Sequence, residues 1–121
     1  MVKEVLNSPR VAKLPNAASQ ILGVYNLRGR IITLIDINQI LGKTAAENVK
    51  KTMVLLIGDN VSVISFFVDN IHDFIEVDEN KITYIHSDQN KPASAYLLGN
   101  YIDEKLGNLT LIDAQRLLML E

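Results

Sequence analysis

Residues 21–42 read ILGVYNLRGRIITLIDINQILG, and this stretch decides the fold. Arg28-Gly29 separates two apolar runs and is a tight-turn candidate, because glycine adopts positive φ without a Cβ clash. The run after it, Arg30 to Ile37, is too rich in aliphatic residues for a strand that is buried on one face only. We therefore predict extended chain over 24–27, a turn, and a strand that has core on both faces or lies in a barrel.

The flanks of this stretch predict two short helices. Asn16 is a candidate N-cap for one to two helical turns over 17–22, which Gly23 can end in a left-handed conformation. Residues 38–42 look like a single helical turn closed by Gly42. Both helices are small, so the long apolar strand remains the main local element.

The remaining pattern predicts further short strands. They lie at 53–57, 61–68, 71–77, 96–102 and 109–112, with a polar surface loop over 43–51, a hairpin loop at 58–60 and a mainly polar loop over 78–92. Asp113 is a candidate cap for a last helix over 114–120. Six or so short strands with frequent turn residues, and only three small helices, are typical of a mostly β fold, either a small barrel or a sandwich.

Composition sets the broad class of the protein. The chain has 121 residues, 48% of them hydrophobic, and no cysteine, so disulfides, thiolate zinc sites and cysteine nucleophiles are excluded. We expect one domain over residues 1–121. No apolar run approaches the roughly 18 residues that a membrane helix requires, and the N-terminus does not resemble a secretory leader. We therefore expect a soluble, cytoplasmic protein without direct membrane insertion.

Charge is unevenly distributed along the chain. Residues 1–35 hold five cations and one carboxylate, a net of +4, while the remainder carries −6. A sequence pI near 5.6 with scattered cations argues against nucleic-acid binding. The basic end is suited to an acidic protein partner, and an ordinary solvated surface is the alternative.

Catalytic and ligand-binding patterns are absent from the sequence. His72 lies in a predicted strand and His86 in a polar loop, and neither accompanies a nucleophile and an orienting group. Five acidic residues lack the spacing of a calcium loop and indicate a solvated face: Asp69, Asp73, Glu76, Asp78 and Glu79. There is no glycine-rich phosphate-binding motif. We predict no catalytic residue, cofactor or metal, and a rigid β scaffold that presents surfaces.

Several motifs resemble the CheW-type chemotaxis adaptor domain. They are Gly23-Val24-Tyr25-Asn26-Leu27-Arg28-Gly29, Asp36-Ile37, Leu41-Gly42, Phe67-Val68-Asp69-Asn70-Ile71, Leu98-Gly99 and Leu111-Ile112-Asp113 with Leu117-Leu118. The resemblance is strong from Pro15 to Gly42 and looser afterwards. Thr33 replaces a proline that is usual in the family, which restores a backbone donor and should be harmless.

The resemblance implies a fold and a function. The implied fold is two small SH3-like barrels that share a core. The implied function is a non-catalytic adaptor in bacterial signal transduction, whose partners are the regulatory domain of a chemotaxis histidine kinase and the cytoplasmic tip of chemoreceptors. Such a protein would join membrane receptor arrays through protein contacts only.

The resemblance also implies a partner-binding site around the Asn26-Leu27-Arg28 turn. Arg28 is the first candidate, because a guanidinium on a rigid turn can grip a carboxylate with two parallel donors. The alternative is that Arg28 satisfies an internal acceptor such as Asp36. Further candidates are Glu4 and Val2 on the neighbouring strand. Gly23 and Gly29 are expected to be backbone requirements of the turns and not contacts.

One departure from the family lies at the start of the sequence. Family members carry about one more β-hairpin ahead of the segment equivalent to residues 2–5. Its absence would leave the first barrel with an unpaired edge. We expect either a homodimer that exchanges or adds strands, or an abbreviated sequence. Three other hypotheses stay open: a CheW-like module from a larger kinase or response-regulator fusion, a small-ligand sensor, and an enzyme.

Overall fold

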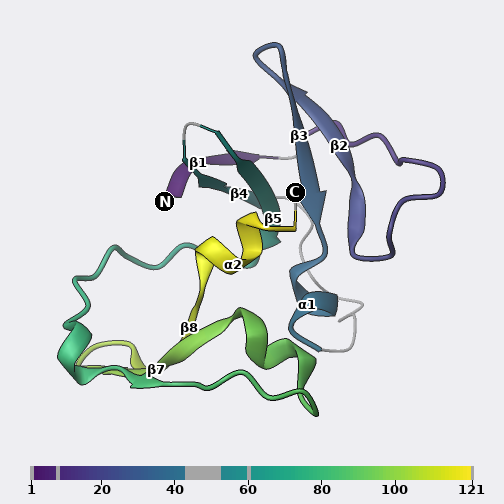
Figure 1. The fold of residues 1–121 in the computed structure, drawn as a ribbon. Coiled ribbons are helices and arrows are strands. Elements are labelled where there is room, and N and C mark those ends of the chain that lie inside the picture. The colour runs from purple at the N-terminus through teal and green to yellow at the C-terminus, as the bar shows by residue number, and fades with distance from the viewer. Residues whose placement is uncertain (1, 8, 43–52, 60, 121) are drawn as a thin grey trace.

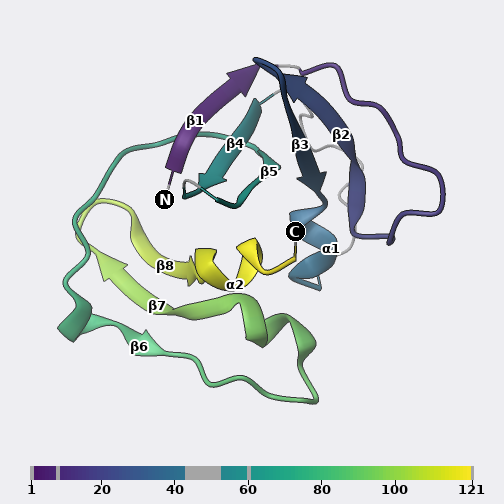
Figure 2. The same ribbon diagram turned by 45° about the horizontal axis from the view of Figure 1, so that its top comes forward.

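Two β-sheets with a short helix between them make up the structure. The computed structural model describes residues 2–7, 9–42, 53–59 and 61–120. One sheet has five strands and the other has three. Helix α2 (Ala114–Leu118) lies between the sheets in both ribbon views (Figures 1 and 2) and contacts the larger one. The predicted mostly β class is confirmed, and the two sheets are consistent with two small β domains.

The larger sheet has the strand order β1-β4-β5-β3-β2. Its strands are β1 (Val2–Asn7), β2 (Ile21–Leu27), β3 (Arg30–Ile35), β4 (Met53–Gly58) and β5 (Val63–Val68). Strands β3 and β5 pair in parallel, and the other neighbours pair antiparallel. Strands β1 and β2 therefore lie at the two edges of this sheet.

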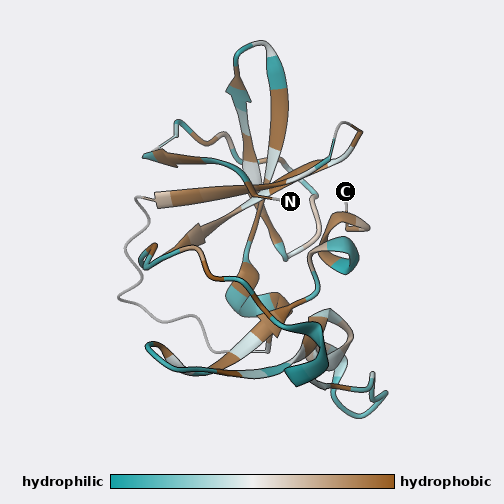
Figure 3. Cartoon of the chain, turned by 90° about the vertical axis from the view of Figure 1, so that its left-hand side faces the viewer, coloured by the Kyte–Doolittle hydropathy of each residue, from teal (hydrophilic) through white to brown (hydrophobic). Residues whose placement is uncertain are grey.

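The central strands of the larger sheet bury side chains on both faces. Leu34 belongs to one hydrophobic cluster and its neighbour Ile35 to another, and Leu56 and Ile57 divide between the clusters in the same way. Successive side chains of a strand point to opposite faces. The prediction of core on both faces of β3 is confirmed, and Figure 3 shows the apolar residues gathered along these strands.

Helix α2 covers the hydrophobic cluster that contains Ile35 and Ile57. Asp113 caps the helix by accepting a hydrogen bond from the Arg116 N–H, as predicted. Leu117 and Leu118 are buried against Ile64 and the rest of that cluster. A five-residue helix is too short to be stable alone, so this burial holds it in place.

The smaller sheet has the order β6-β7-β8 and includes the predicted second hairpin. Its strands are β6 (Thr83–Tyr84), β7 (Leu97–Asp103) and β8 (Gly107–Ile112). The other short helices are α1 (Ile37–Ile40), the predicted single turn, and two 3-10 segments, η1 (Glu79–Lys81) and η2 (Pro92–Tyr96). The polar loop predicted over 43–51 lies outside the described residues.

Two predicted elements are wrong. Residues 17–22 form no helix, because the Gln20 carbonyl accepts the Asp36 N–H at 2.7 Å and Ile21 already pairs with Ile35 at the end of β3. Residues 71–77 form no strand, since no neighbouring strand pairs with them. His72 accordingly lies in open chain. The presence of a distant partner decided the first case and its absence decided the second, and neither can be read from the local pattern.

Two further observations concern the surface of the described chain. None of the helices in its described segments is long and apolar enough to cross a lipid bilayer. Among the same residues, β1 has only β4 as a strand partner. Strand exchange at this edge stays a prediction.

Candidate functional site

The hairpin between β2 and β3 ends in a two-residue turn that displays Arg28. Leu27 pairs with Arg30, and the central residues Arg28 and Gly29 have φ of 49° and 85°. Positive φ at both central positions is the geometry that matches the twist of a hairpin. The Asn26 Oδ1 accepts the Gly29 N–H at 3.0 Å and closes the turn. The predicted tight turn is confirmed, and it fixes the backbone of Arg28.

The Arg28 guanidinium forms a two-point ion pair with Glu4. Its Nη1 donates to Glu4 Oε1 at 3.2 Å, and its Nη2 donates to Glu4 Oε2. The alternative that Arg28 satisfies an internal carboxylate is therefore observed, but the acceptor is Glu4 and not Asp36, the example named from the sequence. The Asp36 Oδ1 instead accepts the Gln39 N–H at the start of α1. Strand β1 carries Glu4 and lies at the opposite edge of the sheet from β2, so the pair links the two edges (Figure 2).

The ion pair is exposed on one side. The side chain of Arg28 is 70% exposed, whereas that of Glu4 is 33% exposed. Hydrogen bonds from Arg28 hold the pKa of Glu4 below its usual range, and Glu4 in turn raises the pKa of Arg28. A guanidinium has five N–H donors, and the two bonds to Glu4 leave others available. The pair is therefore fully charged at neutral pH and can still receive a second carboxylate.

Two further cations stand beside the pair, and sequence reasoning missed both. Lys3 Nζ donates to the Asp59 carbonyl at 3.0 Å, and Arg30 Nη2 donates to the Val61 carbonyl at 3.1 Å. The loop that receives them is held by Asp59, whose Oδ1 accepts the N–H groups of Val61 and Ser62, both at 2.8 Å. These bonds lower the pKa of Asp59. The aspartate after Gly58 was a usable sign of such a turn, but its cationic partners are remote in sequence.

The ion pair borders a groove of about 370 Å³. Its lining consists of Lys3, Glu4, Leu27, Arg28, Arg30, Ile32, Leu56 and Val63. Three of these residues are cations and one is a carboxylate, so the groove has a net positive charge. Its other four lining residues are apolar. This combination suits a partner segment that carries both acidic and apolar side chains.

The other predicted site residues have different positions. Leu27 lines the groove. The side-chain oxygen of Asn26 instead accepts the Gly29 N–H within the turn. Val2 is half exposed on β1 and does not line the groove. A Cβ on Gly23 would lie 2.4 Å from the Ala12 carbonyl oxygen, while a Cβ on Gly29 would meet nothing within 4 Å. Gly23 thus permits a close backbone approach, and Gly29 permits positive φ.

Residues with metal-binding or catalytic potential are scattered. Across residues 2–7, 9–42, 53–59 and 61–120, no three His, Cys, Asp or Glu side chains are grouped to hold a metal ion. His86 and the five acidic residues singled out from the sequence lie outside the groove beside Arg28. What this site offers chemically is a fixed, exposed guanidinium for recognition.

The chain is similar to several known proteins. The family model described as CheW-like domain matches residues 1–121. The chain is similar to the chemotaxis protein CheW of Rhizobium meliloti, with 28% identity over 81 residues that cover 67% of this chain and 52% of that protein. It is also similar to chemotaxis protein CheW of Klebsiella aerogenes, with 26% identity over 121 residues, 99% of this chain and 72% of that protein.

A solved structure is similar as well. The scaffolding protein TtCheW from Thermoanaerobacter tengcongensis matches with a TM-score of 0.76 and 25% identity, covering 92% of this chain and 75% of that one. The chain spans about half the length of the Rhizobium meliloti relative and of a Helicobacter pylori chemotaxis protein CheW that it matches at 27% identity over 81 residues, 67% of this chain and 49% of that protein.

Proposed function

Since the chain belongs to the CheW-like domain family, we propose that it is a non-catalytic chemotaxis adaptor that couples chemoreceptors to a histidine kinase. In this proposal residues 1–121 act as one CheW-like domain. The kinase partner is its regulatory domain, and the receptor partner is the cytoplasmic tip of a chemoreceptor. The protein would then work in the cytoplasm and join receptor arrays only through protein contacts.

The single observation that carries the proposal is the exposed ion pair of Arg28 and Glu4 above a cationic groove. The turn fixes the backbone of Arg28 and Glu4 holds its guanidinium, so less side-chain entropy is lost when a partner carboxylate binds. Glu4 holds one edge of the guanidinium and leaves its other donors to a second carboxylate. Leu27 and Ile32 supply apolar contact area next to this charge.

A titration with the kinase regulatory domain tests the proposal. We expect Arg28→Glu to weaken binding by about thirtyfold, because it places a carboxylate against the partner's carboxylate. Arg28→Ala should weaken binding less. Arg10→Glu is the matched control, since Arg10 is an exposed cation that does not line the groove.

A charge exchange separates a partner contact from a purely structural role. The double variant Glu4→Arg with Arg28→Glu can rebuild the ion pair in reverse. If the pair only stabilises the fold, the double variant binds the kinase domain like the unaltered protein. The proposal expects the double variant to remain weak in binding while unfolding normally. Equal affinity of Arg28→Glu and Arg10→Glu would refute the proposed contact.

A further inference from the structure

The chain between the two sheets contains a run of unpaired backbone. Residues 70–77 have no helix or strand, and none of their N–H or C=O groups takes part in a backbone hydrogen bond with the described chain. One N–H in the run is satisfied locally, because Phe74 donates to the Asp73 carboxylate at 2.8 Å. Unpaired donors and acceptors in a row are a template for an added strand.

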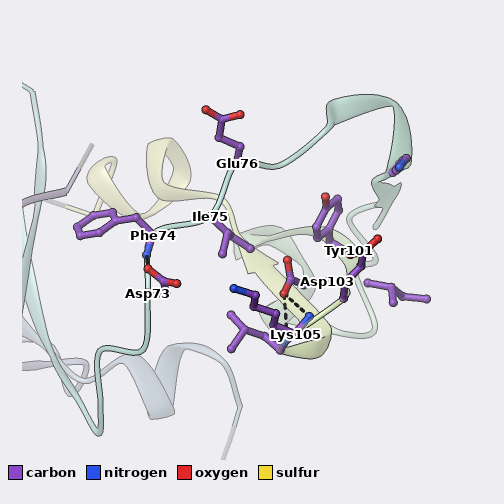
Figure 4. Close-up of a pocket in the computed structure, with 11 residues that line it drawn as sticks. Asp73, Phe74, Ile75, Glu76, Tyr101, Asp103 and Lys105 are labelled. Atoms are coloured by element: carbon purple, nitrogen blue, oxygen red, sulfur yellow. Dashed lines mark hydrogen bonds between the residues drawn. The ribbon is translucent and has the colours of Figure 1, made fainter.

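This run borders a groove beside the β7–β8 hairpin. Figure 4 shows Ile75 directed toward the hairpin and Phe74 directed away from it. The groove has a volume of about 400 Å³, and the nearly buried ring of Tyr101 lines it. The side chains of Phe74 and Ile102 are 83% and 79% exposed. Unpaired backbone and unburied apolar side chains therefore occur at the same place.

The groove carries a net negative charge. Four of its lining residues are acidic and two are basic: Asp73, Glu76, Asp103, Glu104, Lys81 and Lys105. Asp103 is partly engaged, because its Oδ2 accepts the N–H groups of Lys105 and Leu106 at 2.9 Å. Glu76 and Glu104 make no ion pair or hydrogen bond with other described residues. These two carboxylates are available to cations from outside.

We propose that this groove binds an extended segment of a partner protein in which basic and apolar residues alternate. The segment's backbone pairs with residues 70–77 as an added strand. Its apolar side chains contact Ile75 and Tyr101, and its basic side chains contact Glu76 and Glu104. The surface lies on the smaller sheet and its connecting chain, away from Arg28, so the inference does not depend on the adaptor function.

Fluorescence anisotropy with the full chain tests this inference. The probe is a labelled short peptide of alternating lysine and valine. The first control peptide has glutamate in place of lysine, and the second has N-methylated backbone amides that cannot donate. We expect the lysine probe to bind and both controls to bind much more weakly. Affinity should fall as salt rises, because the contacts are exposed charges.

Charge reversals locate the binding site. We expect Glu76→Lys and Glu104→Lys each to weaken binding about fivefold at low salt, the range of exposed ion pairs. Glu79→Lys is the matched control, because Glu79 is a nearby exposed carboxylate that does not line the groove. Equal effects of all three reversals would overturn the site, because they would indicate attraction by net charge alone.

Hydrogen exchange gives an independent measurement. We expect the amides of residues 70–77 to exchange fast in the free chain and to become protected when the lysine probe binds. Protection already present in the free, monomeric chain would overturn the inference, because the segment would then be paired internally. Protection that appears only with self-association would overturn it as well, because a second copy would be the occupant.

Discussion

The Arg28 guanidinium forms a two-point ion pair with the Glu4 carboxylate and so links the tip of one hairpin to the strand at the opposite edge of the same sheet. The residues are 24 positions apart. The turn fixes the backbone of Arg28, and the pairing of β1 with β4 fixes the backbone of Glu4. The fold therefore places the two side chains within reach of each other. The ion pair is thus already formed in the chain without a partner.

Acid should loosen this link. Glu4 has a pKa lowered by Arg28, so its contribution to stability is present above the usual carboxyl pKa of 4.5 and is lost as pH falls through the lowered value. We expect Glu4→Gln to be less stable than the unaltered protein at pH 7, and the difference to shrink as the pH falls below 4.5. Urea unfolding over a series of pH values from 7 downward measures this. The acid sensitivity that remains in Glu4→Gln is expected from Asp59, whose pKa is also lowered. A difference that is unchanged at low pH would contradict the prediction.

Alkali should act through Tyr25. Tyr25 is 4% exposed, and its buried hydroxyl has no hydrogen-bond partner among the described residues. Burial is the main reason that the pKa of Tyr25 is raised. The Tyr25 hydroxyl therefore loses its proton at a higher pH in the folded state than in the unfolded state. The free energy of unfolding falls as the pH rises above about 10.

Removal of that hydroxyl tests the same feature. We expect Tyr25→Phe to leave stability at pH 7 unchanged or higher by up to about 1 kcal/mol, because no hydrogen bond is lost. Its stability should also fall less between pH 9 and pH 11 than that of the unaltered protein. Thermal unfolding across this range measures both effects. A loss of more than about 2 kcal/mol at pH 7 would mean that the hydroxyl is bonded in solution.

Gly23 in β2 and Gly29 in the turn should respond differently to a methyl group. In Gly23→Ala the new Cβ meets the Ala12 carbonyl oxygen, which receives the Val24 N–H at 2.9 Å. We expect a loss of about 1–3 kcal/mol as this pairing opens. Gly29→Ala has free space and only the positive φ to accommodate, with a cost of about 1 kcal/mol. Chemical denaturation compares the two, and a greater loss in Gly29→Ala would reverse their assigned roles.

The outer edge of β1 should mediate self-association. Val2 and Val5 are 50% and 42% exposed on this strand, whose only strand partner among the described residues is β4. We propose that a second copy adds or exchanges strands here, which pairs the free backbone groups. Sedimentation velocity should show a dimer for the unaltered protein, and Val5→Lys should shift it to monomer. A compact monomer with cooperative unfolding would exclude this arrangement.

Much of the larger sheet could be predicted from residues 21–42. Arg28-Gly29 requires positive φ, and the density of aliphatic residues in β3 requires burial on two sides; both requirements are local and both are met. Residues 17–22 misled the prediction, because alanine-rich chain near an N-cap residue favours a helix only when nothing else pairs with it. Asn16 itself adopts φ of 61° in a turn.

The candidate site was predictable only in part. Arg28 and Glu4 were both candidates from the sequence, and an internal carboxylate was foreseen as an alternative acceptor for Arg28, but the example given was Asp36 and not Glu4. Lys3 and Arg30 were not predicted as site residues, because each donates to a backbone carbonyl. Every residue has such a carbonyl, so the sequence does not indicate which one accepts. The negative groove beside the β7–β8 hairpin was likewise hidden, since it joins residues about thirty positions apart.

The amino-acid sequence by itself determined the family, the mostly β class, the turn that presents Arg28 and the two-sided burial of β3, because each follows from backbone preferences and hydrophobic pattern over a few neighbouring residues. Only the tertiary structure decided that Glu4 holds Arg28 and that residues 70–77 stay unpaired. Both depend on which strands become neighbours, and that choice is made by burial over the whole chain, where no single stretch carries the information.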